Sequence, residues 1–303
     1  MNVYLGIDIV STTVKLVAAG VNDATGRLEI LYRKYERHFS KVREKACEML
    51  RDAKQVIGDA NICVAITGSA GLGVAKASGV DFVQEVFATR KCVGTFVPKA
   101  DVVIELGGED AKIVFLTGQL EERMNGSCAG GTGAFIDQMA ALLETDASGL
   151  NELARGAGTI YPIAARCGVF AKTDVQPLIN EGARREDIAA SIFQAVVSQT
   201  ISGLACGKPI RGNVAFLGGP LHFLDQLRER FAITLKLTPE QTIVPDNSQL
   251  FVASGAAYSA ERSVKCSDPS SQGAKFPTIK EFRESLKNLV GAEMQEVQRE
   301  RQR

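Results

Sequence analysis

The sequence repeats a strand–turn–strand pattern, and this repeat constrains the fold more than any other feature. The first copy spans residues 3–19 and turns at Ser11-Thr12-Thr13. The second copy spans residues 101–116 and turns at Gly107-Gly108-Glu109-Asp110. Short apolar strands joined by tight turns are typical of antiparallel hairpins. A further strand at residues 28–36 extends the first hairpin into a predicted three-stranded meander.

Segments with helical spacing and two more strands accompany the hairpins. The strands, residues 61–66 and 214–217, end in glycine-rich turns at 67–73 and at Gly218-Gly219-Pro220. Apolar residues recur every three to four positions in the remaining segments, which predicts helices at 41–56, 84–96, 130–144, 183–206, 221–230 and 248–260. The alternation predicts an α/β protein built from two similar halves.

This organisation predicts domain boundaries. Residues 1–98 would form the first half, completed by a helix at 248–262, and residues 99–247 would form the second. Residues 263–303 are polar and charged, which favours a linker followed by an exposed terminal helix or a disordered end.

Composition excludes several function classes. The 303 residues carry 35 basic and 35 acidic side chains, so the basic surplus typical of nucleic-acid binding is absent. No apolar run reaches the roughly 18–20 residues of a membrane span, and no signal peptide is expected. The seven cysteines include no C-x-x-C pair, which favours reduced thiols in the cytoplasm.

Two cysteines differ from the other five. Cys128 and Cys167 each lie in a loop of small residues that runs into a helix-like segment. A [4Fe–4S] cluster takes four cysteine ligands, and two chains related by a two-fold axis would supply four. The chain is therefore a candidate dimeric iron–sulfur protein.

Three turns that follow strands could hold phosphate groups. They are the segment from Asp8 to Lys15, the segment from Glu105 to Asp110, and Gly218-Gly219. Backbone N–H groups and hydroxyls in such turns can surround phosphate oxygens, and carboxylates can hold Mg²⁺ through water. One such turn alone is more often a plain β-turn, but three in this order favour a nucleotide site. The order resembles that of the actin, sugar kinase and heat-shock chaperone ATPases, which implies a nucleotide cleft between two halves.

Over residues 1–260 the chain resembles a narrower family, the ATP-dependent activators (component A) of 2-hydroxyacyl-CoA dehydratases, related to the ATPase subunits of benzoyl-CoA reductase. The segments that carry the resemblance are Asn125–Gly133 and Arg166–Asp174. The resemblance implies that Cys128 and Cys167 ligate one [4Fe–4S] cluster per dimer. It assigns nucleotide contacts to Ser11, Thr12, Thr13, Val14, Lys15, Gly107, Gly108, Gly218, Gly219 and Gln249.

The chain departs from the pattern of this family at several positions. Val10 stands where the superfamily usually has glycine, Glu105 replaces an aspartate, and Glu109 replaces a glutamine that orients water. The segment 219–222 also differs, and the set resembles the long, multidomain members. The carboxylates expected to act on Mg²⁺ or water are Asp8, Glu105, Glu109 and Asp110.

The resemblance implies an ATPase coupled to electron transfer. A ferredoxin- or flavodoxin-like donor would reduce the cluster of a cytoplasmic homodimer in an anaerobic cell. The dimer would then deliver a low-potential electron to a dehydratase or reductase component, with ATP, ADP and Mg²⁺ as ligands. Two alternatives remain, a small-molecule kinase of the same superfamily and a nucleotide-binding regulatory module without turnover. Bound iron would exclude the kinase.

The sequence predicts different environments for the two histidines. His38 lies in a charged segment and is predicted to be a solvated surface residue. His222 follows the third turn, where nucleotide contact and a plain helix start are equally expected.

Overall fold

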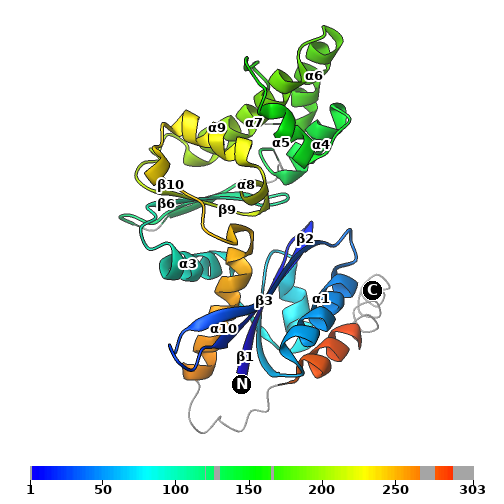
Figure 1. The fold of residues 1–303 in the computed structure, drawn as a ribbon, viewed down its shortest axis with the longest axis vertical. Coiled ribbons are helices and arrows are strands. Elements are labelled where there is room, and N and C mark those ends of the chain that lie inside the picture. Colours follow the sequence, from blue (N-terminus) through cyan, green and yellow to red (C-terminus); the bar gives the residue numbers. More distant parts are fainter. Residues whose placement is uncertain (1, 120, 126–129, 165–166, 267–276, 289–303) are drawn as a thin grey trace, which may run out of the picture. The chain divides into compact units, whose positions relative to one another are not determined.

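The computed structural model divides into two compact units (Figure 1). Unit 1 contains Met1–Thr95 and Leu250–Arg303, and unit 2 contains Phe96–Gln249. Each unit has its own sheet and core. The residues that the structure describes are 2–119, 121–125, 130–164, 167–266 and 277–288.

Unit 1 is built on a five-stranded sheet in the order β3-β2-β1-β4-β5. The first three strands form the predicted antiparallel meander, and β4 and β5 continue the sheet in parallel. Its strands are β1 (Asn2–Ile9), β2 (Thr13–Val21), β3 (Leu28–Arg37), β4 (Asn61–Thr67) and β5 (Asp81–Phe82).

Helices cover both faces of this sheet. Alternate residues of β1 point to opposite faces, so this strand contributes side chains to two cores. Val3, Leu5 and Ile7 pack in one core with α1, whereas Tyr4 packs with the small residues of α10. Gly6 also faces α10, where an added Cβ would lie 1.9 Å from the Ala253 carbonyl oxygen. The helices are α1 (Val42–Ile57), α2 (Gly71–Ser78), α3 (Glu85–Phe96), α10 (Phe251–Cys266) and a helix at residues 279–288.

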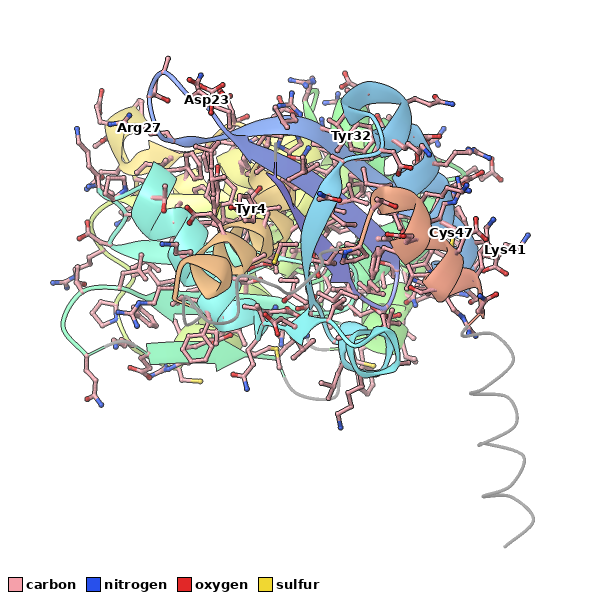
Figure 2. All side chains as sticks on the ribbon, turned by 90° about the horizontal axis from the view of Figure 1, so that it is seen from below. Tyr4, Asp23, Arg27, Tyr32, Lys41 and Cys47 are labelled. Carbon is pink, nitrogen blue, oxygen red and sulfur yellow. The ribbon has the colours of Figure 1, made fainter. Side chains whose placement is uncertain are left out.

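The helix at residues 279–288 corrects the expectation of an exposed or disordered end for this segment. Ile279, Phe282 and Leu286 are buried in the same core as α1. Just before the helix, the Ile62 N–H donates to the Pro277 carbonyl at 2.9 Å. Figure 2 shows the helix beside α1 near Cys47, whose thiol approaches the Arg283 carbonyl at 3.8 Å.

Unit 2 repeats the topology of unit 1. Its strand order is β8-β7-β6-β9-β10, with β6–β8 antiparallel and with β9 and β10 parallel to β6. The two sheets therefore match strand for strand, as the repeated hairpin predicts. The strands are β6 (Val102–Leu106), β7 (Ala111–Phe115), β8 (Glu121–Met124), β9 (Val214–Leu217) and β10 (Thr242–Ile243).

The central helix of unit 2 is α7 (Arg185–Thr200), with Ile188, Ile192 and Phe193 fully buried. The predicted helix at 183–206 is not uniform, because a π-helical turn, Ile201–Ala205, follows α7. The segment Arg185–Ala205 is long and apolar enough to span a membrane, but 67% of its most apolar 18-residue window is buried, as in a core helix. The other helices are α4 (Gly133–Leu142), α5 (Ala147–Ala154), α6 (Gly168–Asn180), α8 (Gly219–Phe223), α9 (Asp225–Leu235) and two 3₁₀ turns, Pro239–Gln241 and Ser248–Leu250.

The docked terminal helix should contribute measurably to the stability of unit 1. Phe282 is 2% exposed, so Phe282→Ala should lower the free energy of unfolding by about 3–5 kcal/mol. Lys280→Ala, at an exposed position of the same helix, is the matched control and should change it by less than about 0.5 kcal/mol. Urea unfolding measures both, and equal stabilities would show that the helix is not docked in solution.

Candidate functional site

The first hairpin of unit 1 ends in a buried ion pair. Asp8 and Lys15 face each other across β1 and β2, and Lys15 Nζ lies 2.6 Å from Asp8 Oδ2. Asp8 Oδ1 is buried without a hydrogen-bond partner among the described residues, and so is the hydroxyl of Thr67, the β4 neighbour of Asp8. Leaving buried polar atoms unpaired is costly, so two of them side by side fit a site that a ligand or water completes.

The turn after Asp8 offers only part of its length to a ligand. The Val10 N–H donates to the Thr13 carbonyl at 3.1 Å and closes the turn. Ser11 is exposed and Thr12 half-buried, whereas Thr13 and the two predicted site residues after it, Val14 and Lys15, are buried. Ser11 and Thr12 are therefore the accessible members of this predicted phosphate loop.

The second turn, in unit 2, has the same register with a different ion pair. Glu105 faces Lys112 across β6 and β7, seven residues apart like Asp8 and Lys15. Lys112 Nζ contacts Asp110 Oδ2 at 2.8 Å, and the Gly107 N–H donates to the Asp110 carbonyl at 2.8 Å. Asp110 thus closes this turn, while Glu109 at its tip is exposed.

The third turn approaches the second hairpin so closely that only glycine fits. Gly218 has φ +89°, and a Cβ there would lie 2.0 Å from the Leu106 carbonyl oxygen. In unit 1, Gly68 is its counterpart, with φ +96° and a Cβ position 2.1 Å from the Ile9 carbonyl oxygen. Sequence reasoning assigned no role to Gly68. The available signal was a glycine in the turn that follows a predicted strand, as at Gly218.

The third turn is also tied to the segment that contains Gln249. The Gly218 N–H donates to the Ser248 carbonyl at 3.2 Å, and His222 Nδ1 lies 2.9 Å from Ser248 Oγ. The His222 N–H closes the start of α8 on the Gly218 carbonyl at 2.9 Å. The Oε1 of Gln249, next in the chain, is buried without a hydrogen-bond partner among the described residues. The structure therefore brings Gly218, Gly219, His222 and Gln249 together.

The second turn holds both ends of the segment that contains Cys128. Before this segment, the Asn125 N–H donates to the Ala111 carbonyl at 3.0 Å, and the Ala111 N–H donates to Asn125 Oδ1 at 2.7 Å. After it, the Gly133 N–H donates to the Gly107 carbonyl at 3.0 Å. The Ala134 N–H likewise donates to the Gly108 carbonyl at 2.7 Å. Cys128 itself lies outside the described residues.

Cys167 is the residue at which α6 begins. It is half-buried, and its carbonyl accepts the Ala171 N–H at 2.9 Å. The next residue, Gly168, lies against α4, where an added Cβ would lie 2.9 Å from Gln138 Oε1. Cys167 is thus the N-cap residue of α6, although its side chain makes no capping hydrogen bond.

The chain that leads to Cys167 is fixed by acidic side chains of neighbouring helices. Asp187 Oδ1 accepts the N–H groups of Gly158 and Thr159 at 2.7 and 3.0 Å, and these bonds lower the pKa of Asp187. Asp174 Oδ2 accepts the Ala164 N–H at 2.7 Å. Asp174 therefore anchors the approach to Cys167 from within α6.

The environments of the other described cysteines do not favour metal binding. Burial raises the pKa of Cys63 to about 11 and also raises the pKa values of Cys92 and Cys47. Such thiols stay protonated near neutral pH and are poor metal ligands. Cys206 is exposed. Among the described residues, no group of three or more His, Cys, Asp or Glu side chains is placed to hold a metal ion.

His38 is not the solvated surface residue that its charged neighbours predict. Its side chain is buried, and its Nε2 lies 2.9 Å from the carbonyl oxygen of Val10 in the first turn. Sequence reasoning missed this residue because the contact joins positions 28 residues apart.

The close approach at Gly218 leads to a stability prediction. Gly218→Ala should cost about 1–3 kcal/mol more than Gly182→Ala, because both glycines have positive φ but only Gly218 has the Leu106 backbone within reach. Thermal or urea unfolding of the two variants gives this difference directly. If both variants lose the same free energy of unfolding, the backbone at Gly218 can move away from Leu106 at little cost, which would contradict the prediction.

The environment of His222 leads to a pH prediction. Burial, and then the charge of Arg228, lower the pKa of His222 from its usual value near 6.5. The unfolded chain therefore binds a proton below pH 6.5 that the folded chain resists, so stability should fall as the pH drops through this range. His222→Gln should show a shallower fall when unfolding free energies are compared between pH 7.5 and 5. Parallel curves would contradict the prediction.

Comparisons with known proteins agree with this arrangement. Residues 5–260 match the BadF/BadG/BcrA/BcrD ATPase family. The chain is 31% identical over 210 residues to the 2-hydroxyisocaproyl-CoA dehydratase activator of Clostridioides difficile, covering 68% of this chain and 71% of that protein. It is 32% identical over 205 residues to the activator of lactoyl-CoA dehydratase of Anaerotignum propionicum, covering 65% and 76%.

Among solved structures, the C. difficile activator with bound ADPNP superposes with a TM-score of 0.74 at 28% identity. The match covers 88% of this chain and 98% of that one. The two matching sheets and their helices thus form the actin-like ATPase fold that the sequence predicts. The chain belongs to the BadF/BadG/BcrA/BcrD ATPase family.

Proposed function

We propose that this chain is an ATP-hydrolysing iron–sulfur activator that delivers a low-potential electron to a partner 2-hydroxyacyl-CoA dehydratase or related reductase. The observation that carries the proposal is the attachment of the second turn to both sides of the Cys128 segment, through Asn125, Gly133 and Ala134. Any shift of this turn on ATP binding or hydrolysis would be passed to that segment through backbone hydrogen bonds. A kinase of this fold has no evident need for such a connection.

The proposed nucleotide contacts follow from which side chains and backbone groups of the three turns are accessible to a ligand. Ser11 and Thr12 are the accessible phosphate contacts of the first turn, with Thr13, Val14 and Lys15 as their buried support. Gly107 and Gly108 serve the second turn. Gly218, Gly219, His222 and Gln249 serve the adenosine. The Oε1 of Gln249, which has no hydrogen-bond partner in the described ranges, supports this role.

The four candidate carboxylates come from both hairpins, and Asp8 and Glu105 are the buried ones. Asp8 Oδ1, to which no described residue donates a hydrogen bond, fits a water of a bound Mg²⁺ ion, because Mg²⁺ keeps several of its waters in proteins. Glu105, Glu109 and Asp110 belong to the second turn, where the exposed Glu109 can orient water.

Cys128 and Cys167 are the proposed cluster ligands. The half-buried Cys167 at the start of α6 fits a thiolate ligand, and two chains would provide the four thiolates of one [4Fe–4S] cluster. When bound, such a cluster supplies one-electron transfer at low potential. The protein contributes the N-terminus of α6 and the fixed approach through Asp174, which together hold the thiol in place.

The proposal extends to partners and setting. Residues 1–98 with the helix at 248–262 form the first ATPase half, residues 99–247 the second, and 263–303 an appended segment. The working form is a cytoplasmic homodimer in an anaerobic cell, reduced by a ferredoxin- or flavodoxin-like donor. The names of the relatives, both dehydratase activators, support a dehydratase as the partner.

Iron content tests the proposal directly. Protein purified without oxygen should contain about four iron and four acid-labile sulfide per dimer. Cys128→Ser and Cys167→Ser should each lose most of this iron because a ligand is missing. Cys206→Ser, which changes an exposed cysteine of the same unit, is the matched control and should keep it. Iron-free wild-type protein after anaerobic reconstitution would reject the activator function and leave the kinase or the regulatory module.

A further inference from the structure

The corner between β3 and α1 has an unusual backbone. Phe39 and Ser40 have φ values of +46° and +63°, so two consecutive non-glycine residues adopt the left-handed conformation. Such residues persist where surrounding contacts hold them, and they gather at functional sites. The Phe39 side chain is 77% exposed, so its packing does not hold the corner.

The His38 imidazole joins this corner to the first turn. The Ser40 N–H donates to Nδ1 at 3.1 Å, so Nδ1 is an acceptor and the ring proton lies on Nε2. Nε2 then donates to the Val10 carbonyl at 2.9 Å. One neutral tautomer satisfies both bonds, whereas a protonated ring would oppose its Nδ1–H to the Ser40 N–H.

The same corner determines which groups of the turn remain available. The Thr12 carbonyl accepts the His38 N–H at 3.2 Å, and the Thr13 carbonyl accepts the Val10 N–H at 3.1 Å. The carbonyl groups of Val10, Thr12 and Thr13 are thus all engaged. No acceptor in the described part of the chain takes the backbone N–H groups of Ser11 and Thr12. A turn with engaged carbonyls and available N–H groups suits an anion.

We propose that His38 is a positioning residue for the phosphate groups of ATP. Its Nε2–H holds the Val10 carbonyl toward β3 and α1, which keeps the Ser11 and Thr12 N–H groups free for phosphate oxygens. His38 acts through the turn and does not touch the nucleotide. This inference rests on the proposed function, because it takes the first turn as a phosphate site.

Variants of His38 separate its two hydrogen bonds. His38→Ala removes both and should weaken binding of a non-hydrolysable ATP analogue with Mg²⁺ by about tenfold, because the bond to the Val10 carbonyl that positions the turn is lost. His38→Gln can still donate from its amide to Val10 and should recover most of the affinity. Phe39→Ala, at the exposed neighbouring position, is the matched control and should bind like the wild type. Steady-state ATPase assays should show the loss mainly in KM.

The tautomer can be observed directly, because the chain has only two histidines. Imidazole ¹⁵N spectra of histidine-labelled protein, assigned with His38→Gln, should show His38 protonated at Nε2 and not at Nδ1. Addition of the ATP analogue should shift this signal. The measurement uses folded wild-type protein, so it remains decisive if His38→Ala fails to fold.

Two outcomes overturn the inference. One is a proton on Nδ1 of His38, and the other is a folded His38→Ala with wild-type affinity. Failure of the proposed phosphate site is recognised separately with Ser11→Asp, an exposed substitution that should repel phosphate and lower affinity at least a hundredfold. If Ser11→Asp binds normally, the phosphate site lies elsewhere. If it loses binding while the His38 variants do not, only the role of His38 is wrong.

Discussion

Each unit depends on one close approach between backbones. The chain that leaves the parallel strand β4 or β9 passes directly over the end of the neighbouring hairpin, at Gly68 above Ile9 and at Gly218 above Leu106. At both positions a side chain would overlap a carbonyl oxygen, so the turn after the strand and the turn of the hairpin stay in contact. This contact brings the Thr67 hydroxyl beside Asp8 and fixes the start of α8 against β6. The polar groups proposed to bind ATP follow from this packing.

Much of this arrangement was predictable, because local patterns encode it. Apolar runs with glycine or hydroxyl turns predicted both hairpins, and Gly218-Gly219-Pro220 drew attention by its composition. Its counterpart Gly68 did not, since it stands at the start of a longer glycine-rich stretch that resembles an ordinary loop. The short helix α5 and the strand β8 were also missed. Each is too brief to show a clear period, and tertiary contacts stabilise them.

Two segments whose burial was predicted wrongly show why local sequence patterns did not predict the remaining features. His38 stands between charged residues, yet its ring is buried by contacts with a turn 28 residues earlier. In the C-terminal segment, Ile279, Phe282 and Leu286 have helical spacing, but the surrounding charges favoured an exposed helix. Their burial depends on a surface of α1 and β4 formed more than two hundred residues earlier. The charged residues of such a helix lie on its solvent-facing side, so a count of charges along the sequence does not reveal the apolar face that packs in the core.

The two hairpins use the same register for different purposes. In unit 1 the buried Lys15 pairs with Asp8 Oδ2, and Asp8 Oδ1 has no hydrogen-bond partner within the described part of the chain, which is costly until a ligand or water reaches it. In unit 2 Lys112 contacts Asp110 of the turn itself, and Asp110 also closes the turn on Gly107. The first arrangement suits a site that must accept and release a ligand. The second stiffens the turn to which both sides of the Cys128 segment are bonded, so a displacement there would move those bonds as one body. The repeated hairpin thus keeps one register with two different ion pairs, Lys15 with Asp8 in unit 1 and Lys112 with Asp110 in unit 2.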